Sequence, residues 1–449
     1  MTRKYFGTDG IRGQANTPPM TAELALKVAM ATVHVLHKKN NLEQTNKVVV
    51  GKDTRLSGYM LEQAMASGFV SMGMDVVLTG PVPTPAIAML TRSLRADLGI
   101  VISASHNPYQ DNGIKIFGPD GYKLSDALEE EIEEVLASPL DNILPGPDVI
   151  GKANRLDDAA GRYIEHVKKS IPEDISLSGL KIVIDCAHGA AYKVAPQILQ
   201  ELEADVVCIG IDPDGRNIND GVGATHTDLL ERTVLEENAD IGIALDGDAD
   251  RLIVVDEKGQ RVDGDQLMGM LAISMQQMGT LQSGLVCTVM SNLGLEKLLR
   301  SKDIPFFRTS VGDRYVVEAM REQKSNLGGE QSGHIILGDI GTTGDGMLAA
   351  LQILAIIQKE NKPASEACSV FTPMPQILRN ICYQDSFPLD NKDVVVAIQK
   401  AEQTLSNDGR LLVRPSGTEN VIRVMAEGEN MEFITSVVDD LCTVVERAV

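Results

Sequence analysis

The sequence predicts an α/β protein with three similar α/β domains and a smaller α+β domain at the C-terminal end. Three observations support this fold class. The chain has 449 residues, more than one hydrophobic core usually serves, so about three domains of roughly 150 residues are expected. Strand-like and helix-like segments alternate along the first third. A strand-and-loop pattern also occurs three times and does not recur in residues 367–449.

The first elements alternate between strands and helices. Apolar runs at 47–51 and 75–78 predict strands, and the segment 57–73 between them predicts a helix. A further strand is expected at 97–102. This order is typical of α/β units.

Proline and glycine clusters mark the expected domain boundaries. Two of these boundaries lie near 139–155 and 363–375, and a third is expected near 254–260. We therefore predict α/β domains at 1–150, 151–255 and 256–366, and an α+β domain at 367–449.

An apolar strand containing a glycine leads into a polar loop at three places. The strands lie at 97–100, 240–243 and 326–329, and the loops that follow carry Ser105, Asp248 and His334. Loops at the carboxyl ends of strands usually bind the ligand in α/β sheets. We therefore expect these three side chains at equivalent strand ends.

The C-terminal segment has a different pattern. Residues 411–414 and 421–427 predict two paired strands joined by a glycine turn, and a final helix is expected from about Met431. This pattern predicts the smaller α+β domain.

Composition excludes several classes of protein. Apolar runs stay far below the ~20 residues of a membrane helix, and the N-terminus lacks a signal-peptide pattern, so a soluble, cytoplasmic protein is expected. The net charge of −22 argues against nucleic-acid binding, which needs a basic surface. Six scattered cysteines without C-x-x-C spacing indicate reduced thiols.

The segment 102–108, Ile-Ser-Ala-Ser-His-Asn-Pro, predicts an exposed loop that presents Ser105. Its hydroxyl could act as a nucleophile or carry a phosphoryl group. The alternative is a serine-rich turn without a chemical role. A hydrolase nucleophile is disfavoured because no G-x-S-x-G surrounds Ser105, and because His106 would point away from it in an extended chain.

Three alternating carboxylates, Asp246, Asp248 and Asp250, follow the apolar strand 241–245. Each pair, about 5 Å apart, would repel by on the order of 3 kcal/mol without a cation, so a magnesium site is predicted. A solvated acidic turn is the alternative. The segment does not match a calcium-binding EF-hand loop, because the sixth position of that loop needs glycine and this chain has Arg251 there.

Two further loops suit a phosphosugar. Residues 414–420, Arg-Pro-Ser-Gly-Thr-Glu-Asn, combine a glycine turn, two hydroxyls and arginine, which suits a phosphate dianion. The alternative is an ordinary hairpin with surface arginines. Residues 328–334 offer a carboxylate, a hydroxyl and an imidazole, which suit sugar hydroxyls.

Together with residues 5–13, Tyr-Phe-Gly-Thr-Asp-Gly-Ile-Arg-Gly, these four loops resemble the α-D-phosphohexomutase superfamily over essentially the whole chain. The resemblance implies three α/β domains with mixed sheets and an α+β domain, arranged around a central cleft. It also implies one Mg²⁺ per subunit and a small phosphosugar substrate. Many members form dimers, so a homodimer is possible.

The resemblance assigns roles to individual residues. It implies that Ser105 is the phosphoserine and that a phosphoryl oxygen on it completes the magnesium ligands Asp246, Asp248 and Asp250. Lys115 is the leading acid/base candidate, and Arg12 lies beside the reacting oxygens. Arg251 is expected to neutralise charge during transfer. The residues implied in phosphate binding are Arg414, Ser416, Gly417, Thr418 and Arg423.

The implied reaction has two halves. Phosphoserine donates to the free hydroxyl of the sugar, and the other phosphate of the resulting 1,6-bisphosphate then returns to Ser105. The intermediate must turn over, which predicts hinge motion near 363–375. A bisphosphorylated sugar, here glucosamine 1,6-bisphosphate, is the expected activator.

The segment 329–334, Gly-Glu-Gln-Ser-Gly-His, is similar to members that act on glucosamine phosphates. Members that act on mannose or glucose usually have Glu-Met-Ser-Ala-His or Glu-Glu-Ser-Phe-Gly there. The sugar-binding residues are then Glu330, Ser332 and His334. The implied activity interconverts glucosamine 6-phosphate and glucosamine 1-phosphate, a precursor of UDP-N-acetylglucosamine.

Three alternatives stay open. One is a mutase of the same superfamily that acts on glucose or mannose phosphates. Another is a non-catalytic protein that binds sugar phosphates, although Ser105 and the three aspartates argue against it. The third is a magnesium-dependent phosphatase.

Overall fold

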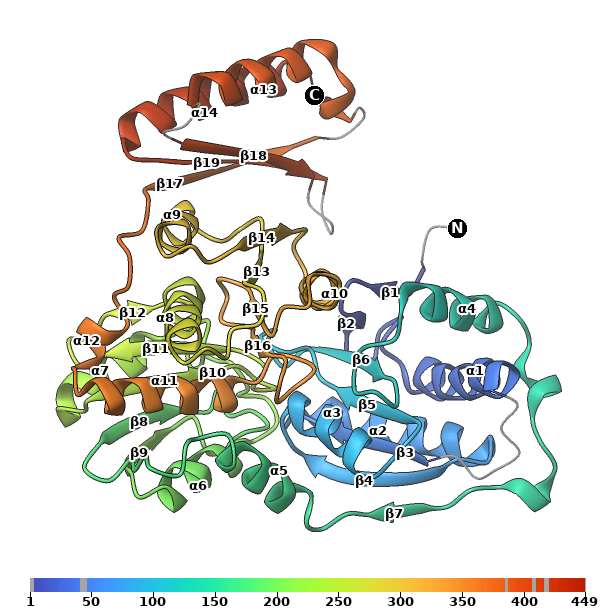
Figure 1. Ribbon diagram of the computed structural model, residues 1–449. Coiled ribbons are helices and arrows are strands. Elements are labelled where there is room, and N and C mark those ends of the chain that lie inside the picture. The colour runs from blue at the N-terminus through green and yellow to red at the C-terminus, as the bar shows by residue number, and fades with distance from the viewer. Residues whose placement is uncertain (1–3, 41–46, 384–386, 406–408, 416–419, 449) are drawn as a thin grey trace. The chain divides into compact units, whose positions relative to one another are not determined.

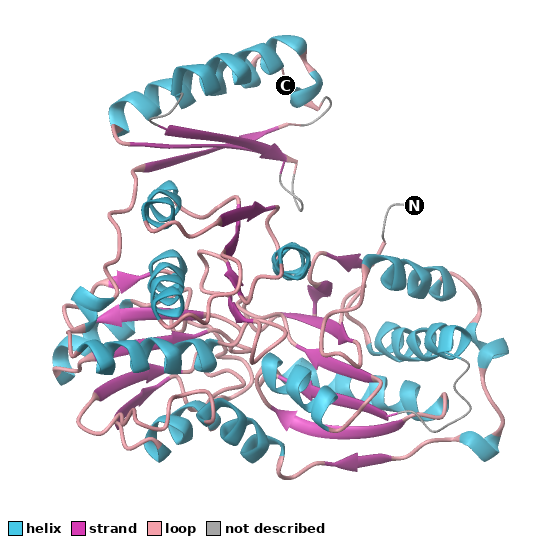
Figure 2. Cartoon of the chain, viewed as in Figure 1, coloured by secondary structure: helices cyan, strands magenta, loops and turns pink. Residues whose placement is uncertain are grey.

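The computed structural model describes residues 4–40, 47–383, 387–405, 409–415 and 420–448 (Figure 1). They form two compact units. One unit contains the chain up to Thr288 and Phe307–Ser369, and the other contains Val289–Phe306 and Val370–Val449. Three mixed α/β sheets and one antiparallel sheet are present, which confirms the predicted fold class (Figure 2). The four predicted domain ranges stay predictions.

The first sheet has seven strands in the order β1-β2-β6-β5-β3-β4-β7. Parallel pairing joins β5, β3, β4 and β7, and antiparallel pairing joins β1, β2, β6 and β5. The strands are β1 Phe6–Gly7, β2 Gly10–Gln14, β3 Lys47–Lys52, β4 Asp75–Pro81, β5 Leu98–Ile102, β6 Asp111–Phe117 and β7 Ala153–Arg155. The strands predicted at 47–51, 75–78 and 97–102 are therefore confirmed.

Helices cover both faces of this sheet. They are α1 Ala22–Asn40, α2 Leu56–Ser71, α3 Thr84–Ser93 and α4 Asp126–Leu136, and α2 confirms the helix predicted at 57–73. Successive side chains of a strand point to opposite faces. Val48 and Val50 of β3 join the core formed with α1 and α2, whereas Gly51 faces Ile87 of α3.

The second and third sheets are smaller and also mixed. Their orders are β12-β11-β10-β8-β9 and β14-β13-β15-β16. The second contains β8 Lys181–Asp185, β9 Asp205–Ile209, β10 Ile241–Leu245, β11 Leu252–Asp256 and β12 Arg261–Val262, with α5 Ala159–Lys168, α6 Val194–Glu201 and α7 Asp228–Glu237. The third contains β13 Leu285–Thr288, β14 Phe306–Thr309, β15 Leu327–Gly329 and β16 Ile335–Leu337. The helices that follow β12 are α8 Gly264–Gln277, α9 Leu293–Ser301, α10 Asp313–Gln323, α11 Gly346–Glu360 and α12 Ala364–Ala367.

The three predicted repeats have the same local structure. Strands β5, β10 and β15 each pair antiparallel with the next strand of the chain. Each carries a glycine beneath a helix. A Cβ on Gly99 would lie 2.2 Å from Thr91 of α3, one on Gly242 2.7 Å from Val234 of α7, and one on Gly328 2.5 Å from Met320 of α10. The repeated glycine therefore allows a helix to approach the strand that ends in a polar loop.

The second unit contains the predicted α+β domain. Strands β17 Gln376–Cys382, β19 Val421–Gly428 and β18 Gly409–Pro415 form an antiparallel sheet in that order. Helices α13 Lys392–Leu405 and α14 Met431–Glu446 pack on it through a core that includes Val424, Ile434 and Leu441. Helix α9 lies in this unit. The predicted strands and final helix are confirmed.

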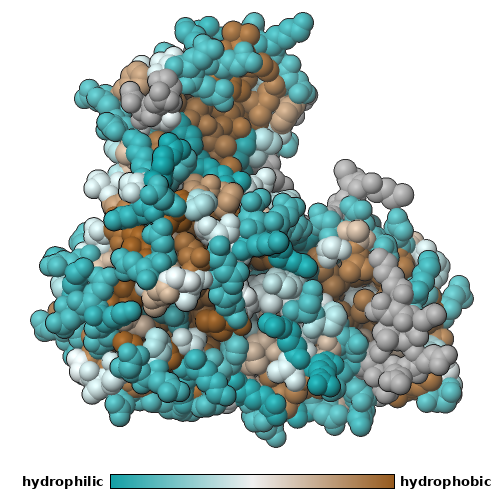
Figure 3. All heavy atoms as spheres, viewed as in Figure 1, coloured by the Kyte–Doolittle hydropathy of each residue, from teal (hydrophilic) through white to brown (hydrophobic). Residues whose placement is uncertain are grey.

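Hydrophilic side chains cover much of the face shown in Figure 3. Among the described residues, no helix is both long enough and apolar enough to span a membrane.

An ion pair joins the first and third α/β domains. Nη1 and Nη2 of Arg314, in α10, donate to the Glu129 carboxylate of α4 at 2.9 and 2.6 Å. Asp126 also pairs with Arg314. Arg314 is 6% exposed and Glu129 is 2% exposed. Because the pair is bidentate and buried, removal of Arg314 takes two short charge-assisted hydrogen bonds from the buried Glu129 carboxylate.

We predict that Arg314→Met destabilises the first unit by about 3–5 kcal/mol because it breaks a buried bidentate ion pair. Urea unfolding of the full chain measures this. Arg232→Met, at an exposed position of α7, is the control and should change the free energy of unfolding by no more than about 0.5 kcal/mol. Equal effects of the two substitutions would contradict the prediction.

Candidate active site

Ser105 lies in the loop after β5 and is almost fully buried, at 1% exposure. Its Oγ donates a hydrogen bond to Oδ2 of Asp246 at 2.6 Å, so the expectation of an exposed loop was wrong. The φ angle of Ser105 is +52°, which is left-handed rather than extended. For this reason His106 does not point away, and its Nδ1 lies 3.4 Å from Ser105 Oγ.

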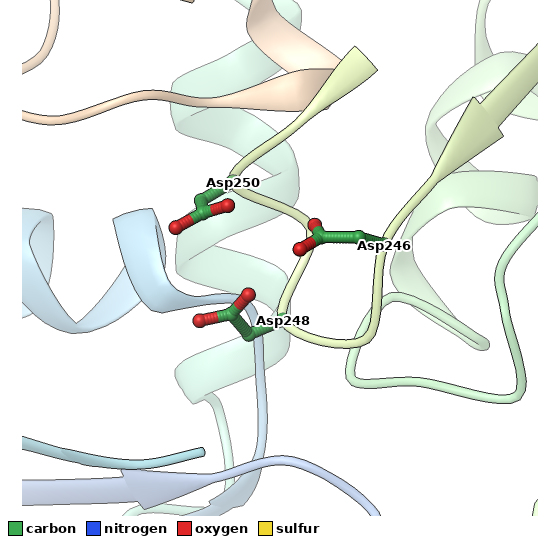
Figure 4. A group of neighbouring side chains, drawn as sticks. All are labelled: Asp246, Asp248 and Asp250. Atoms are coloured by element: carbon green, nitrogen blue, oxygen red, sulfur yellow. The ribbon is translucent and has the colours of Figure 1, made fainter. Parts of the chain in front are cut away.

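The three predicted metal ligands converge in the turn between β10 and β11 (Figure 4). Carboxylate oxygens of Asp246, Asp248 and Asp250 lie within 4.8 Å of one another, and all three side chains are buried. Oδ1 of Asp248 and Oδ1 of Asp250 have no hydrogen-bond partner among the described residues. Buried carboxylate oxygens without partners fit a hard cation with oxygen ligands.

The electrostatics of the turn also fit a bound cation. Burial raises the pKa of Asp246 to about 8, and the neighbouring charges of Asp250 and Asp248 add to this effect. Burial also tends to raise the pKa of Asp250, but Lys115 and His334 hold that pKa well below the usual value. A divalent cation would favour the charged form of all three carboxylates.

Lys115 of β6 lies against this group. Its Nζ is 3.0 Å from Oδ2 of Asp248, 3.4 Å from Oδ2 of Asp250 and 3.5 Å from Oδ2 of Asp9. Burial lowers its pKa, but Asp248 and Asp9 outweigh burial and raise it well above the ordinary value. Lys115 is therefore an ammonium group that offsets the charge of the aspartates.

The pairing of β2 with β6 brings Arg12 close to Lys115. Arg12 lies opposite Gly113, two residues before Lys115, and pairs with Asp9. Asp9 also pairs with Lys123. Burial raises the pKa of Asp9, but Lys115, Lys123 and Arg12 together hold it below the usual value. Sequence reasoning placed Asp9 within a motif but missed its role and that of Lys123.

Two arginine nitrogens near the aspartate turn lack a hydrogen-bond partner among the described residues. Nε of Arg12 and Nε of Arg251 are buried and have no hydrogen-bond partner among the described residues. Arg251 follows the aspartate turn, and its Nε is 3.9 Å from Oδ1 of Asp250. Such donors suit the oxygens of a phosphoryl group. Sequence reasoning also missed Thr84, whose hydroxyl donates to Oδ2 of Asp248 at 2.6 Å.

The predicted sugar loop lies between β15 and β16. Oε1 of Glu330 accepts from the Gly312 N–H at 3.2 Å, and Oγ of Ser332 is buried without a partner among the described residues. His334 is buried, with Nδ1 3.6 Å from Oδ2 of Asp250. His334 therefore lies beside the aspartate turn, and its contact with sugar stays a prediction.

The protonation of His334 is subject to opposing effects. Burial lowers its pKa, but Asp250, Asp313 and Glu330 raise it to about 9. However, Nε2 accepts the Gly344 N–H at 3.1 Å, so that nitrogen keeps its lone pair. We favour the neutral ring with its proton on Nδ1, because a proton on Nε2 would meet the Gly344 N–H.

Two of the predicted phosphate ligands lie side by side in the second unit. Arg414 of β18 is the direct antiparallel partner of Arg423 of β19. Burial lowers the pKa of Arg414, and the charge of Arg423 lowers it further. Two neighbouring cations are stabilised by an anion. Ser416, Gly417 and Thr418 lie outside the described residues.

Comparisons with known proteins agree with this geometry. Four models of the phosphoglucomutase/phosphomannomutase family match the chain in order. They are alpha/beta/alpha domain I at 3–141, domain II at 161–259, domain III at 263–374 and the C-terminal domain at 379–444.

Curated relatives match over their full length. A phosphoglucosamine mutase of Parvibaculum lavamentivorans is 58% identical over 448 residues, which is 100% of this chain and 99% of the relative. One of Xanthobacter autotrophicus is 57% identical over 448 residues, with coverage of 100% and 99%.

Solved structures show the same fold. A phosphoglucomutase/phosphomannomutase family protein of Burkholderia thailandensis has a TM-score of 0.82 at 24% identity, covering 98% of this chain and 97% of that chain. N-acetylphosphoglucosamine mutase of Aspergillus fumigatus, in complex with GlcNAc-6P and magnesium, has a TM-score of 0.68 at 16% identity, with coverage of 99% and 96%. From the family models and the identities of the relatives, this chain belongs to the phosphoglucomutase/phosphomannomutase family, within the α-D-phosphohexomutase superfamily.

Proposed function

We propose that the chain interconverts glucosamine 6-phosphate and glucosamine 1-phosphate by way of phosphorylated Ser105 and a sugar 1,6-bisphosphate. The observation that carries the proposal is the hydrogen bond of 2.6 Å from Ser105 Oγ to Asp246, within a group of three buried aspartates. A phosphoryl carrier beside a cation site fits group transfer between hydroxyls. The names of the relatives support the sugar.

We propose Mg²⁺ as the cation held by Asp246, Asp248, Asp250 and a phosphoryl oxygen on Ser105. Its ligands would all be oxygen, which Mg²⁺ prefers, and when bound it would polarise the phosphoryl group. The Aspergillus fumigatus enzyme, whose solved complex contains magnesium, supports this choice.

In the first half reaction the bond from phosphorus to Ser105 Oγ breaks and a bond to the sugar oxygen forms. The proton of the sugar hydroxyl is transferred overall to Ser105 Oγ. We assign this transfer to Lys115: its ammonium donates a proton to Ser105 Oγ as the phosphorus–oxygen bond breaks, and the amine that remains takes up the proton of the sugar hydroxyl. Arg12 and Arg251 would stabilise the phosphoryl oxygens. The second half reverses these steps with the other phosphate.

The phosphate that does not react would bind at Arg414 and Arg423, together with Ser416, Gly417 and Thr418. The adjacent positions of the two arginines support this role. Glu330, Ser332 and His334 are proposed to recognise the sugar. A carboxylate at 330 also suits the C2 ammonium that distinguishes glucosamine from glucose and mannose.

We predict that Ser105→Ala lowers the rate at least about a thousandfold, as expected for the loss of a covalent carrier. Phosphorus NMR follows glucosamine 6-phosphate with Mg²⁺ and a trace of sugar 1,6-bisphosphate. Ser93→Ala, at an exposed position of α3, should retain activity. An active Ser105→Ala enzyme would exclude the phosphoserine route, and release of inorganic phosphate alone by wild type would indicate a phosphatase.

Metal binding should raise the melting temperature, because metal at 100 times its Kd stabilises the fold by about 2.7 kcal/mol. We predict that Asp246→Asn, which keeps the side-chain size, loses most of the Mg²⁺-dependent increase. Scanning calorimetry with and without Mg²⁺ measures this increase in melting temperature. Asp212→Asn, on the exposed surface, is the control. An increase of the same size in Asp246→Asn would rule out this ligand set.

Glu330→Gln should lower kcat/KM for glucosamine 6-phosphate about 10- to 100-fold, since a charge-assisted hydrogen bond contributes about 1.5–3 kcal/mol. The change for glucose 6-phosphate should be less than about threefold, because that sugar lacks the ammonium. Glu322→Gln, at an exposed position of α10, is the control. If wild type converts glucose or mannose phosphate as fast as glucosamine phosphate, the alternative mutase activity is correct instead.

A further inference from the structure

The main-chain carbonyls of Ser105 and Asn107 are each held by two side chains. Nη2 of Arg55 donates to O of Ser105 at 3.1 Å and to O of Asn107 at 2.6 Å. Nδ2 of Asn219 donates to the same two oxygens at 2.9 and 3.0 Å. Arg55 directly precedes α2 of the first α/β domain, and Asn219 lies between β9 and α7 of the second. Both domains therefore hold the same two peptide groups, and we call Arg55 and Asn219 the carbonyl clamp.

Arg55 is itself fixed by a ring of buried contacts. Its Nη1 donates to Oδ2 of Asp53 at 3.0 Å, and both side chains are 0% exposed. Oδ2 of Asp53 accepts from Ser103 Oγ at 2.6 Å, and Ser103 Oγ accepts the N–H of Ser105 at 2.9 Å. The ring therefore returns to the residue whose carbonyl Arg55 holds. A buried arginine whose three side-chain nitrogens all donate hydrogen bonds is a rigid support because its guanidinium is planar.

The clamp acts on a residue with an unfavourable backbone conformation. Ser105 has a φ of +52°, which costs a residue other than glycine about 1 kcal/mol or more. Such a conformation persists only when neighbouring groups enforce it. Here the four hydrogen bonds to O of Ser105 and O of Asn107 fix the peptide groups. The Oγ of Ser105 is then directed at Asp246, at 2.6 Å.

The aspartate turn packs directly on the clamp. A Cβ on Gly247 would lie 2.6 Å from O of Ser105 and 2.8 Å from Nδ2 of Asn219. Gly247 separates Asp246 from Asp248, so two carboxylates of the metal site flank the point of contact. Asn219 therefore sets the distance between the serine loop and the metal ligands.

We propose that Arg55 and Asn219 are positioning residues for phosphoryl transfer, which hold Ser105 in its left-handed conformation against the aspartate turn. This inference rests on the proposed function. Neither side chain bonds to Ser105 Oγ or to a carboxylate of the turn in the described residues. Their effect on the reaction comes from the direction of the Ser105 side chain, which a shift of about 1 Å would disturb by as much as 100-fold in rate.

The main test uses Asn219→Gly. Asn219 has a φ of +60°, so glycine keeps the backbone without strain and removes the amide side chain with its donors. Asn217→Ala is the matched control, since that amide bonds to Asp212 and Asp214 within its own turn. Excess enzyme phosphorylated with a sugar 1,6-bisphosphate is mixed with glucosamine 6-phosphate, and formation of glucosamine 1-phosphate is followed in a single turnover.

We expect the single-turnover rate constant of Asn219→Gly to fall 10- to 100-fold while KM changes less than threefold. A merely structural loss would lower the fraction of active enzyme and leave the rate constant at saturating enzyme unchanged. Arg55→Lys keeps the charge opposite Asp53 but replaces the planar fork by one ammonium, and it should show the same loss. Rate constants within twofold of wild type in both variants would overturn the proposal.

Amide hydrogen exchange tests the clamp without substrate. The N–H groups of Ser105 and Asn107 bond within the loop, and they should exchange at least tenfold faster in Asn219→Gly than in Asn217→Ala. Unchanged exchange would overturn the clamp. If wild type isomerises no hexosamine phosphate, the proposed function fails separately, because the exchange measurement does not depend on it.

Discussion

The rest of the site depends on the balance of buried charge around the aspartate turn. Asp246, Asp248 and Asp250 are removed from water, where uncompensated charges are very unfavourable. Lys115 from the first sheet and His334 from the third approach the turn of the second. Lys115 supplies compensating charge, and His334 places the proton of its Nδ1 beside Asp250, so the turn brings together residues of all three α/β domains.

Some of these buried groups still have unused capacity to bind a ligand. Among the described residues, the carboxylates have oxygens without hydrogen-bond partners, and the Nε atoms of Arg12 and Arg251 also lack such partners. Buried groups of both signs that lack hydrogen bonds suit a cation and a phosphoryl anion together. The proposed transfer uses both, since a bound phosphoryl group would contact the metal and the arginines.

Ser105 shows where tertiary structure overrides the local pattern. The order of residues around it indicates an exposed, extended loop, yet the serine is buried and its φ is positive. Contacts from Arg55 and Asn219, which lie 50 residues before and 114 residues after it, cause this conformation. A local pattern contains no information about such partners, so the direction of His106 was predicted wrongly for the same reason.

The sequence by itself determined the α/β fold class, the repeated strand-and-loop units and the types of residue that the site contains. These features depend on periodicity and spacing along the chain, as in the glycine of β5, β10 and β15 and the alternate aspartates of the turn. The tertiary structure alone decided the contacts of Asp9, Lys123, Thr84, Arg55 and Asn219. Most of their partners are distant in sequence, and only packing of the sheets and loops brings those groups within bonding distance.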